Sequence, residues 1–227
     1  MFSRVPWVLL VFAASLLLDF FSSTALAFDP LRFNPETITV DKNISLPKDH
    51  AIGSTDAPVT VIDYSSFSCT HCKTAFEELI RPLHESYVKQ GKVLLIMRHF
   101  PLDYLSFSAS VFLECYRQHV ESDNDKFLNI TGVLFDIGAE ARNKEDLTSR
   151  LDKIILDSGL SESVRKEFSS CMNDLDVKNE VLHSKLFAIK QLEIAGTPVL
   201  YINGERYTGK FNFSNFSDRI ERALGKK

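Results

Sequence analysis

The sequence has few of the residues that mark unusual protein classes. Its 227 residues include only 9 glycines, 8 prolines and 1 tryptophan. This low glycine and proline content excludes collagen-like and low-complexity chains. With 4 cysteines, the chain also has too few for a miniprotein held together by disulfides. The remaining composition, 44% hydrophobic and 25% charged, is that of a globular chain able to bury a full core in one large or two small domains.

The sequence also lacks an excess of positive charge. Lys and Arg together number 26 and Asp and Glu 30, which gives a net charge of −4. Such a chain has no general attraction for nucleic acid or for an anionic membrane surface. We therefore expect no nucleic-acid partner.

Long apolar runs are missing except at the N-terminus. Arg4 precedes an apolar run over 5–18, Asp19 ends it, and residues 22–27 end in an Ala-x-Ala pattern. The run is shorter than the ~20 residues that a membrane span needs, and the three parts together are typical of a secretory signal. We predict a cleaved signal peptide over 1–27 and export to a bacterial periplasm. A retained membrane anchor is the alternative.

The next part of the chain predicts a β-α-β unit after a short edge strand at 37–40. Residues 59–64 form a β-branched apolar run, and 92–99 form a second one. A helix is expected between them over 69–90, kinked or split by Pro82. Two strands joined in this way should be parallel, with a right-handed crossover.

The rest of the chain predicts a helical block followed by a β-β-α unit. Apolar residues recur at helical spacing over 106–193, which predicts four or five helices. Strands at 198–202 and 205–208 flank Asn203-Gly204, the strongest two-residue hairpin signal. A closing helix is expected over 213–224.

A Cys-Thr-His-Cys sequence lies where the first strand should lead into the helix. At a helix N-terminus, unpaired amides and the helix dipole favour the thiolate form of Cys69, and a positive His71 would add to this. A stabilised thiolate makes the disulfide form a better oxidant, with Cys69 as attacking sulfur and Cys72 as the buried resolving sulfur. A zinc site would need two more spaced ligands, which the sequence lacks. We expect no metal and no cofactor other than the Cys69–Cys72 disulfide itself.

Three segments give the chain a resemblance to a known family. They are GSTDAPVTVIDYSSFSCTHC at 53–72, RHFPL at 98–102 and GTPV at 196–199. Together they resemble the DsbA-type, thioredoxin-like disulfide oxidoreductases over about 50–225. The resemblance implies an α/β thioredoxin fold with an inserted all-helical domain, and oxidation of dithiols in newly exported proteins.

The predicted organisation follows from this resemblance and from the order of the elements. Residues 1–27 are the signal peptide and 28–57 an extended leader. The thioredoxin-like domain comprises 58–104 and 194–227, and the helical domain is inserted over 105–193.

The resemblance assigns roles to residues outside the cysteine motif. Thr197 and Pro198 match a cis-proline loop that faces Cys69 and pairs with an extended substrate peptide. Asp63 matches an acidic residue that handles the proton of Cys72, through water and with its pKa raised by burial. An exposed or hydrogen-bonded aspartate at a strand end is the alternative.

The second cysteine pair predicts a structural crosslink. Cys115 and Cys171 lie on apolar helix faces, and catalytic use of Cys69–Cys72 leaves them to each other. Two buried free thiols are the alternative. We interpret Arg98 as a counter-charge near Asp63. The other histidines are expected at the surface or at strand ends, without chemistry: His50, His84, His99, His119 and His183.

The favoured function is that of a monomeric oxidase acting on reduced or unfolded exported proteins and reset by a membrane-bound, DsbB-like oxidase. Thr70 and Thr197 differ from the commonest DsbA residues, so an isomerase or reductase, reset by a membrane reductase, is the runner-up. Related isomerases dimerise through an N-terminal domain, for which residues 28–50 are too short. A non-enzymatic, chaperone-like binding module is the third reading.

Overall fold

The computed structural model describes residues 49–120 and 123–225. The predicted signal peptide, most of the predicted leader and the predicted strand at 37–40 lie outside these residues. The described residues all fall within 35–227, the larger of two units into which the chain divides.

A five-stranded mixed sheet, in the order β1-β3-β2-β4-β5, forms the centre of the structure. Its strands are β1 (His50–Ile52), β2 (Val59–Ser65), β3 (Val93–His99), β4 (Val199–Ile202) and β5 (Glu205–Arg206). Strands β2 and β3 are parallel, as predicted, and the other pairs are antiparallel. Strand β1 falls within the predicted extended leader, so the end of that leader is part of the sheet.

The predicted helix after β2 forms as one run of consecutive helical segments. They are α1 (Thr70–Ala75), η2 (Phe76–Ile80), α2 (Arg81–Leu83) and η3 (His84–Val88), of which η2 and η3 are π-helical. Pro82 lies between the two π-helical turns. A proline removes one helical hydrogen bond, and wider turns of this kind accommodate the loss without ending the helix.

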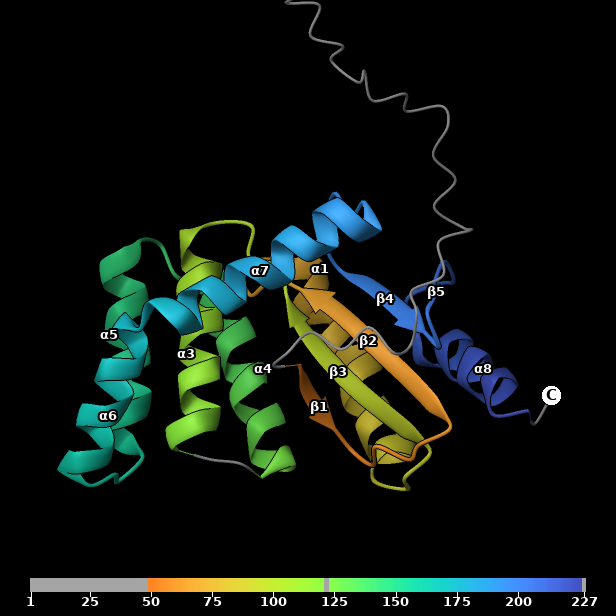
Figure 1. The fold of residues 1–227 in the computed structure, drawn as a ribbon, viewed down its shortest axis with the longest axis horizontal. Helices are drawn as coiled ribbons and strands as arrows, with labels where there is room; N and C mark the ends of the chain where they lie inside the picture. Colours follow the sequence, from red (N-terminus) through yellow and green to blue (C-terminus); the bar gives the residue numbers. More distant parts are fainter. Residues whose placement is uncertain (1–48, 121–122, 226–227) are drawn as a thin grey trace, which may run out of the picture. The chain divides into compact units, whose positions relative to one another are not determined.

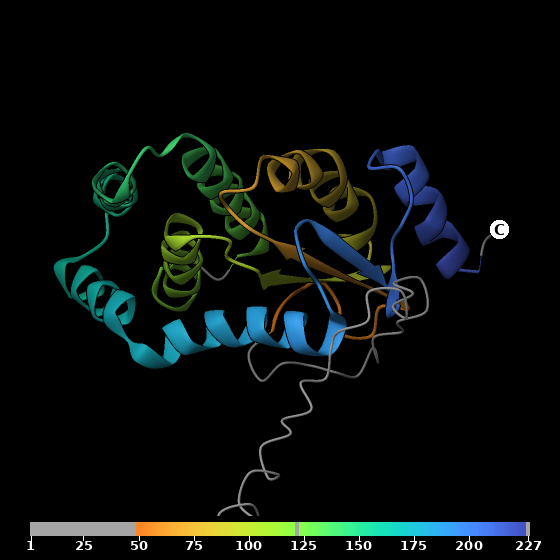
Figure 2. The same cartoon turned by 90° about the horizontal axis from the view of Figure 1, so that it is seen from above.

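Five helices follow, the upper number expected from the sequence. They are α3 (Tyr104–His119), α4 (Asn124–Glu140), α5 (Lys144–Asp157), α6 (Glu162–Asn173) and α7 (Leu175–Leu192), and the chain then closes with α8 (Phe213–Ala223). Figure 2 shows the sheet between α7 on one side and the α1–η3 run with α8 on the other. Helices α3 to α6 lie beyond the β1 edge of the sheet (Figure 1).

Alternation along β2 divides the core into two faces. Val59 and Val61 belong to the cluster that includes the buried side chains of the α1–η3 run. Ile62 and Tyr64 belong to a second cluster that includes Ala188 and other buried residues of α7. Because side chains alternate along a strand, Asp63 faces the same side as Val61. The carboxyl group therefore lies on the side of the sheet where α1 starts.

Helix α4 packs directly against the loop between β2 and α1. Gly138 lies so close to Phe67 that a Cβ atom at position 138 would overlap the Phe67 carbonyl oxygen. One turn earlier, the rings of Phe135 and Phe67 are 4.8 Å apart. The helical segment thus contacts the loop that leads into the cysteine motif.

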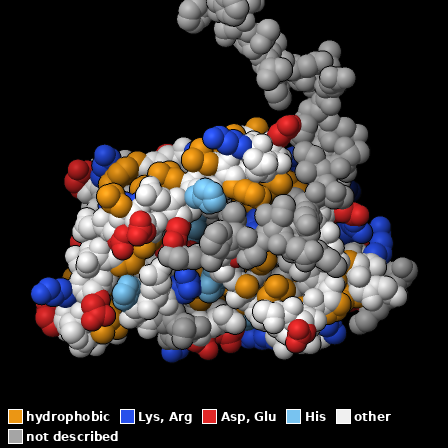
Figure 3. All heavy atoms as spheres, viewed as in Figure 1, with side chains coloured by type: hydrophobic (Ala, Val, Ile, Leu, Met, Phe, Trp, Pro, Cys, Tyr) orange, Lys and Arg blue, Asp and Glu red, His pale blue; other side chains and the backbone are white. Residues whose placement is uncertain are grey.

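Helix α7 combines a buried face with exposed apolar side chains. Leu175, Leu182, Leu186 and Ile189 are exposed, and Figure 3 shows hydrophobic side chains on the face along which α7 runs. Within the described ranges, no helix is both long enough and apolar enough to cross a bilayer.

Candidate active site

The cysteine motif sits at the start of the helical run, directly after the central strand. Cys69 is the N-cap residue of α1, and its Sγ accepts a hydrogen bond of 3.2 Å from the backbone N–H of Cys72. Both cysteines are free thiols; Cys69 is half-buried and Cys72 is buried. The unpaired amides of the first turn favour negative charge at the N-cap position. This geometry suits a thiolate on Cys69.

The Thr197–Pro198 loop lies beside Cys69. The peptide bond between these residues is cis. The Sγ of Cys69 donates a hydrogen bond of 3.5 Å to the carbonyl oxygen of Thr197. The Thr197 hydroxyl oxygen is buried without a hydrogen-bond partner among the described residues, and Thr197 interacts with the side chain of Cys72. The structure thus places the Thr197–Pro198 loop beside the two cysteines of the motif.

Cys72 is suited to hold its proton until the reaction requires its loss. Burial raises the pKa of the Cys72 thiol, and its interaction with Cys69 and the charge of Asp63 raise it further. Because only the thiolate is nucleophilic, a buried Cys72 that keeps its proton is poorly suited to be the first attacking sulfur.

Asp63 is a buried carboxyl in the middle of β2, 1% exposed. Burial raises its pKa to about 7, although a hydrogen bond of 2.7 Å from the Ser65 hydroxyl opposes this rise. Asp63 also borders a cavity of about 20 Å³, which is enough for one water molecule. Asp63 is therefore not the exposed aspartate of the alternative interpretation, but it is hydrogen-bonded, as that interpretation also allowed.

Three other predicted residues lie away from this cluster or serve the scaffold. His71 is exposed on α1 and has no described partner in the site. Cys115 of α3 and Cys171 of α6 form a disulfide, with Cα atoms 5.8 Å apart and a sequence separation of 56. The free-thiol alternative for this pair is therefore wrong.

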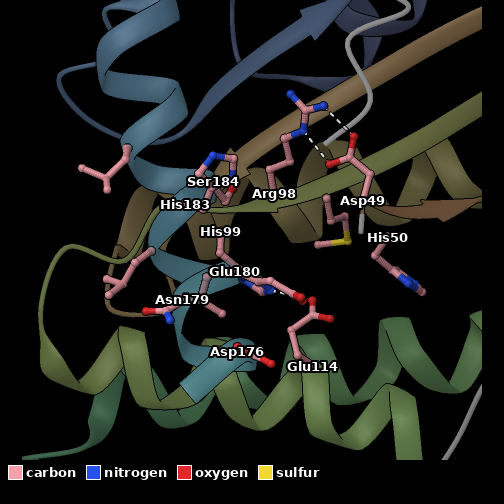
Figure 4. A pocket seen from close by; sticks show the side chains of 14 residues that line it. Asp49, His50, Arg98, His99, Glu114, Asp176, Asn179, Glu180, His183 and Ser184 are labelled. Atoms are coloured by element: carbon pink, nitrogen blue, oxygen red, sulfur yellow. Dashed lines mark hydrogen bonds and ion pairs between the residues drawn. The ribbon is translucent and has the colours of Figure 1, made fainter. Parts of the chain in front are cut away.

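Arg98 has a different counter-ion from the one expected. Its Nε and Nη2 donate hydrogen bonds of 2.7 and 2.5 Å to the two carboxylate oxygens of Asp49, as Figure 4 shows. Arg98 also donates to the Tyr64 hydroxyl. By strand alternation, Arg98 and Tyr64 face the opposite side of the sheet from Asp63. No sequence signal marked Asp49, which lies 49 residues before Arg98 in a polar segment.

The expectation for the remaining histidines is wrong in one case and incomplete in another. His84 is buried rather than at the surface. His99 ends β3, as expected, but its Nε2 lies 2.9 Å from a carboxylate oxygen of Glu114 on α3. His99 and Glu114 both border the cavity beside Asp63. Glu114 stands among apolar residues on one face of α3, which could have marked it as buried. The sequence alone does not show that His99 is its partner.

A cysteine pair at the start of the helix after the central strand, facing a cis-proline loop, defines the dithiol site of a thioredoxin-fold protein. The chain belongs to the thioredoxin family, whose model, described as Thioredoxin, matches residues 45–222. The predicted thioredoxin fold with inserted helices is thereby confirmed.

Similar proteins agree with this assignment. A Rickettsia bellii protein, provisionally named a protein-disulfide oxidoreductase, is 22% identical over 189 residues, which are 83% of this chain and 67% of that protein. The chain thus spans about two thirds of that relative. The crystal structure of Wolbachia pipientis alpha-DsbA1 is 28% identical, with a TM-score of 0.68, over 80% of this chain and 94% of that one. Bacillus subtilis BdbD shares the fold, with a TM-score of 0.67 at 17% identity over 83% of this chain and 99% of that one.

Proposed function

We propose that this protein is an exported thiol:disulfide oxidoreductase that introduces disulfides into newly secreted proteins through Cys69 and Cys72. One observation carries the proposal: the Sγ of Cys69 accepts the Cys72 amide hydrogen bond while lying against the Thr197 carbonyl. An anion-stabilising position and a neighbouring backbone edge are what exchange with an extended peptide requires.

The reaction starts from the disulfide form of the pair. A substrate thiolate attacks Sγ of Cys69, which forms a mixed disulfide and releases Cys72 as a thiolate. A second substrate thiolate then attacks the substrate sulfur of the mixed disulfide and releases Cys69 as a thiolate. Two electrons have passed from the substrate dithiol to the cysteine pair. No other redox group is needed for this step.

The proton balance involves Asp63. The Cys72 thiolate released in the first step is disfavoured by burial, which raises its pKa, so it takes up a proton. Asp63 supplies this proton, and its raised pKa of about 7 lets it be protonated at neutral pH. When a membrane-bound, DsbB-like partner reoxidises the pair, Cys72 loses the proton and Asp63 accepts it.

Substrates are reduced or unfolded exported proteins, met as extended chains at the Thr197–Pro198 loop. The periplasm is the proposed compartment because structural disulfides persist outside the cytoplasm. The protein acts there as a monomer after its signal peptide, residues 1–27, is removed.

Refolding of reduced ribonuclease tests this function. The oxidised wild-type protein should restore ribonuclease activity, and Cys69→Ala should lose all oxidation because the attacked sulfur is gone. A chaperone-like binder would perform equally well with and without Cys69. Equal refolding by the two proteins would therefore overturn the proposal.

Isomerisation or reduction is the second candidate, favoured by the threonine before the cis-proline. A hydroxyl at position 197 beside Cys72 changes the balance between the dithiol and disulfide forms. Ribonuclease with scrambled disulfides separates the two activities. A wild-type protein that reactivates scrambled but not reduced ribonuclease is an isomerase rather than an oxidase.

A further inference from the structure

Asp63 has almost no contact with solvent, yet the proposed cycle requires it to gain and lose a proton. Its side chain lies on the face of the sheet that packs against the α1–η3 run, and the residue is 1% exposed. The adjoining cavity of about 20 Å³ is lined by Asp63, Ser65, His99 and Glu114 among others. A single water in this cavity would contact the carboxyl group of Asp63 and the polar side chains that line the cavity with it.

His99 and Glu114 connect this small cavity with a larger one. Both residues also line a cavity of about 600 Å³ between β3, α3 and α7, which Figure 4 shows from close by. The His99 side chain is 13% exposed and that of Glu114 8%, so both reach further toward solvent than Asp63 does. The pair therefore borders both the buried carboxyl and the outer cavity.

The hydrogen bonding of the pair fixes which atoms can carry a proton. Burial would raise the pKa of Glu114, but His99 and Arg117 together lower it to about 2. An ionised Glu114 only accepts, so the Nε2–H of His99 is the donor in their 2.9 Å bond. That bond leaves Nδ1 as the atom of His99 that can exchange a proton with water, and the adjacent Glu114 carboxylate stabilises positive charge on the ring.

The other charged groups around Asp63 are less suited to this role. His50 also borders the small cavity, but burial and the charge of Arg117 lower its pKa to about 4, so it stays neutral. Arg98 also borders the small cavity, but it keeps its proton and its guanidinium is paired with Asp49. Cys72 is the group served by Asp63.

From this arrangement we propose that His99, held by Glu114, relays the proton between Asp63 and solvent through a water in the cavity. The proposal rests on the function proposed above. In reoxidation, Cys72 passes its proton to Asp63, Asp63 passes it through the water to Nδ1 of His99, and His99 releases it to the outer cavity. Oxidation of substrate runs the same path inward. His99 and Glu114 are thus positioning residues, because neither touches a reacting sulfur.

The test separates the Cys72 step from the Cys69 step. The reduced full-length protein is mixed with oxidised glutathione, and the resolution of the Cys69–glutathione disulfide by Cys72 is followed from below to above pH 7. Alkylation of Cys69 by iodoacetamide reports the first sulfur alone. His99→Gln should slow resolution at least about tenfold at neutral pH, as loss of a proton carrier does, and leave alkylation unchanged. Added imidazole should restore much of the rate.

His183→Gln is the matched control, because His183 lines the larger cavity but not the small one. It should resolve the mixed disulfide at the wild-type rate. If His99→Gln does so as well, or is slow without imidazole rescue, the relay is refuted. If His99→Gln does not fold, Glu114→Gln decides in its place: slower resolution with unchanged alkylation supports the relay, and a wild-type rate overturns it.

The same preparations distinguish the relay from the function on which it rests. A wild-type protein that fails to oxidise reduced ribonuclease contradicts the proposed function itself. A wild-type protein that succeeds, beside an unaffected His99→Gln variant, contradicts only the relay.

Discussion

The backbone amide of Cys72 donates a hydrogen bond to the Sγ of Cys69, the sulfur with which Cys72 exchanges in the proposed reaction. Cys69 sits at the N-cap, where it receives amide hydrogen bonds and is partly open to substrate. Cys72 lies one turn further, buried and with a raised pKa. The two chemically identical side chains therefore have different surroundings because of their positions on a single helical turn.

This difference predicts which single-cysteine variant traps a substrate. In Cys72→Ala, Cys69 should still exchange with a small disulfide such as oxidised glutathione, but no second sulfur remains to release the adduct. The mixed disulfide should accumulate and be visible as the added mass of one glutathione. Cys69→Ala should form little or no adduct at neutral pH, because Cys72 is buried and protonated. Equal adduct formation by the two variants would contradict the assigned roles.

Replacing the buried carboxyl should change how stability depends on pH. The pKa of Asp63 rises from 3.8 to about 7 on folding. Between these pH values the folded state binds a proton that the unfolded state has lost, so wild-type stability falls as the pH rises through this window. Asp63→Asn does not titrate, so it should gain up to about 4 kcal/mol over the wild type above pH 7.

Urea denaturation at a series of pH values measures this effect. Below about pH 3 the two proteins should differ little, since Asp63 is protonated in both the folded and the unfolded state there. The same variant should resolve mixed disulfides more slowly despite its greater stability. A stability difference that does not vary with pH would show that Asp63 is already ionised in the folded protein.

The disulfide between Cys115 and Cys171 should contribute stability without contributing to the redox reaction. It links α3 and α6 across 56 residues of sequence. Closing a loop of that length restricts the unfolded chain by up to about 4 kcal/mol in the loop-entropy model. The double variant Cys115→Ala/Cys171→Ala should lose stability up to this amount in denaturant unfolding, while its oxidation of reduced ribonuclease is retained at temperatures where it is folded.

The buried ion pair between Arg98 and Asp49 should be costly to break from one side. The side chains of Arg98 and Asp49 are 1% and 6% exposed. Asp49→Asn leaves the guanidinium buried without its counter-charge, for which a loss of about 3–5 kcal/mol is expected. Replacing both residues together, as Asp49→Asn with Arg98→Met, should cost less than the sum of the two single changes. A double-mutant cycle in urea measures this coupling, and additive losses would argue against the pair.

More of the fold than of the site could be predicted from the sequence. Alternating and helical apolar patterns located β2, β3, the helical run after Cys69 and the hairpin, because each pattern is local. The π-helical turns beside Pro82 have no such local signature. Two pairs, Arg98 with Asp49 and His99 with Glu114, join residues distant in sequence, so only the folded chain brings them together. Asp63 and Arg98 have separate surroundings because they lie on opposite faces of the sheet, and this depends on the register between β2 and β3, which is a property of the folded chain.

The missing side chain at Gly138 sets how closely the inserted helices approach the cysteine motif. Because α4 presses its backbone onto Phe67, two residues before Cys69, the loop that carries the nucleophile rests on the inserted helices as well as on the sheet. Any side chain larger than hydrogen at position 138 would have to displace this loop, and with it the position of the Cys69 sulfur relative to the cis-proline loop.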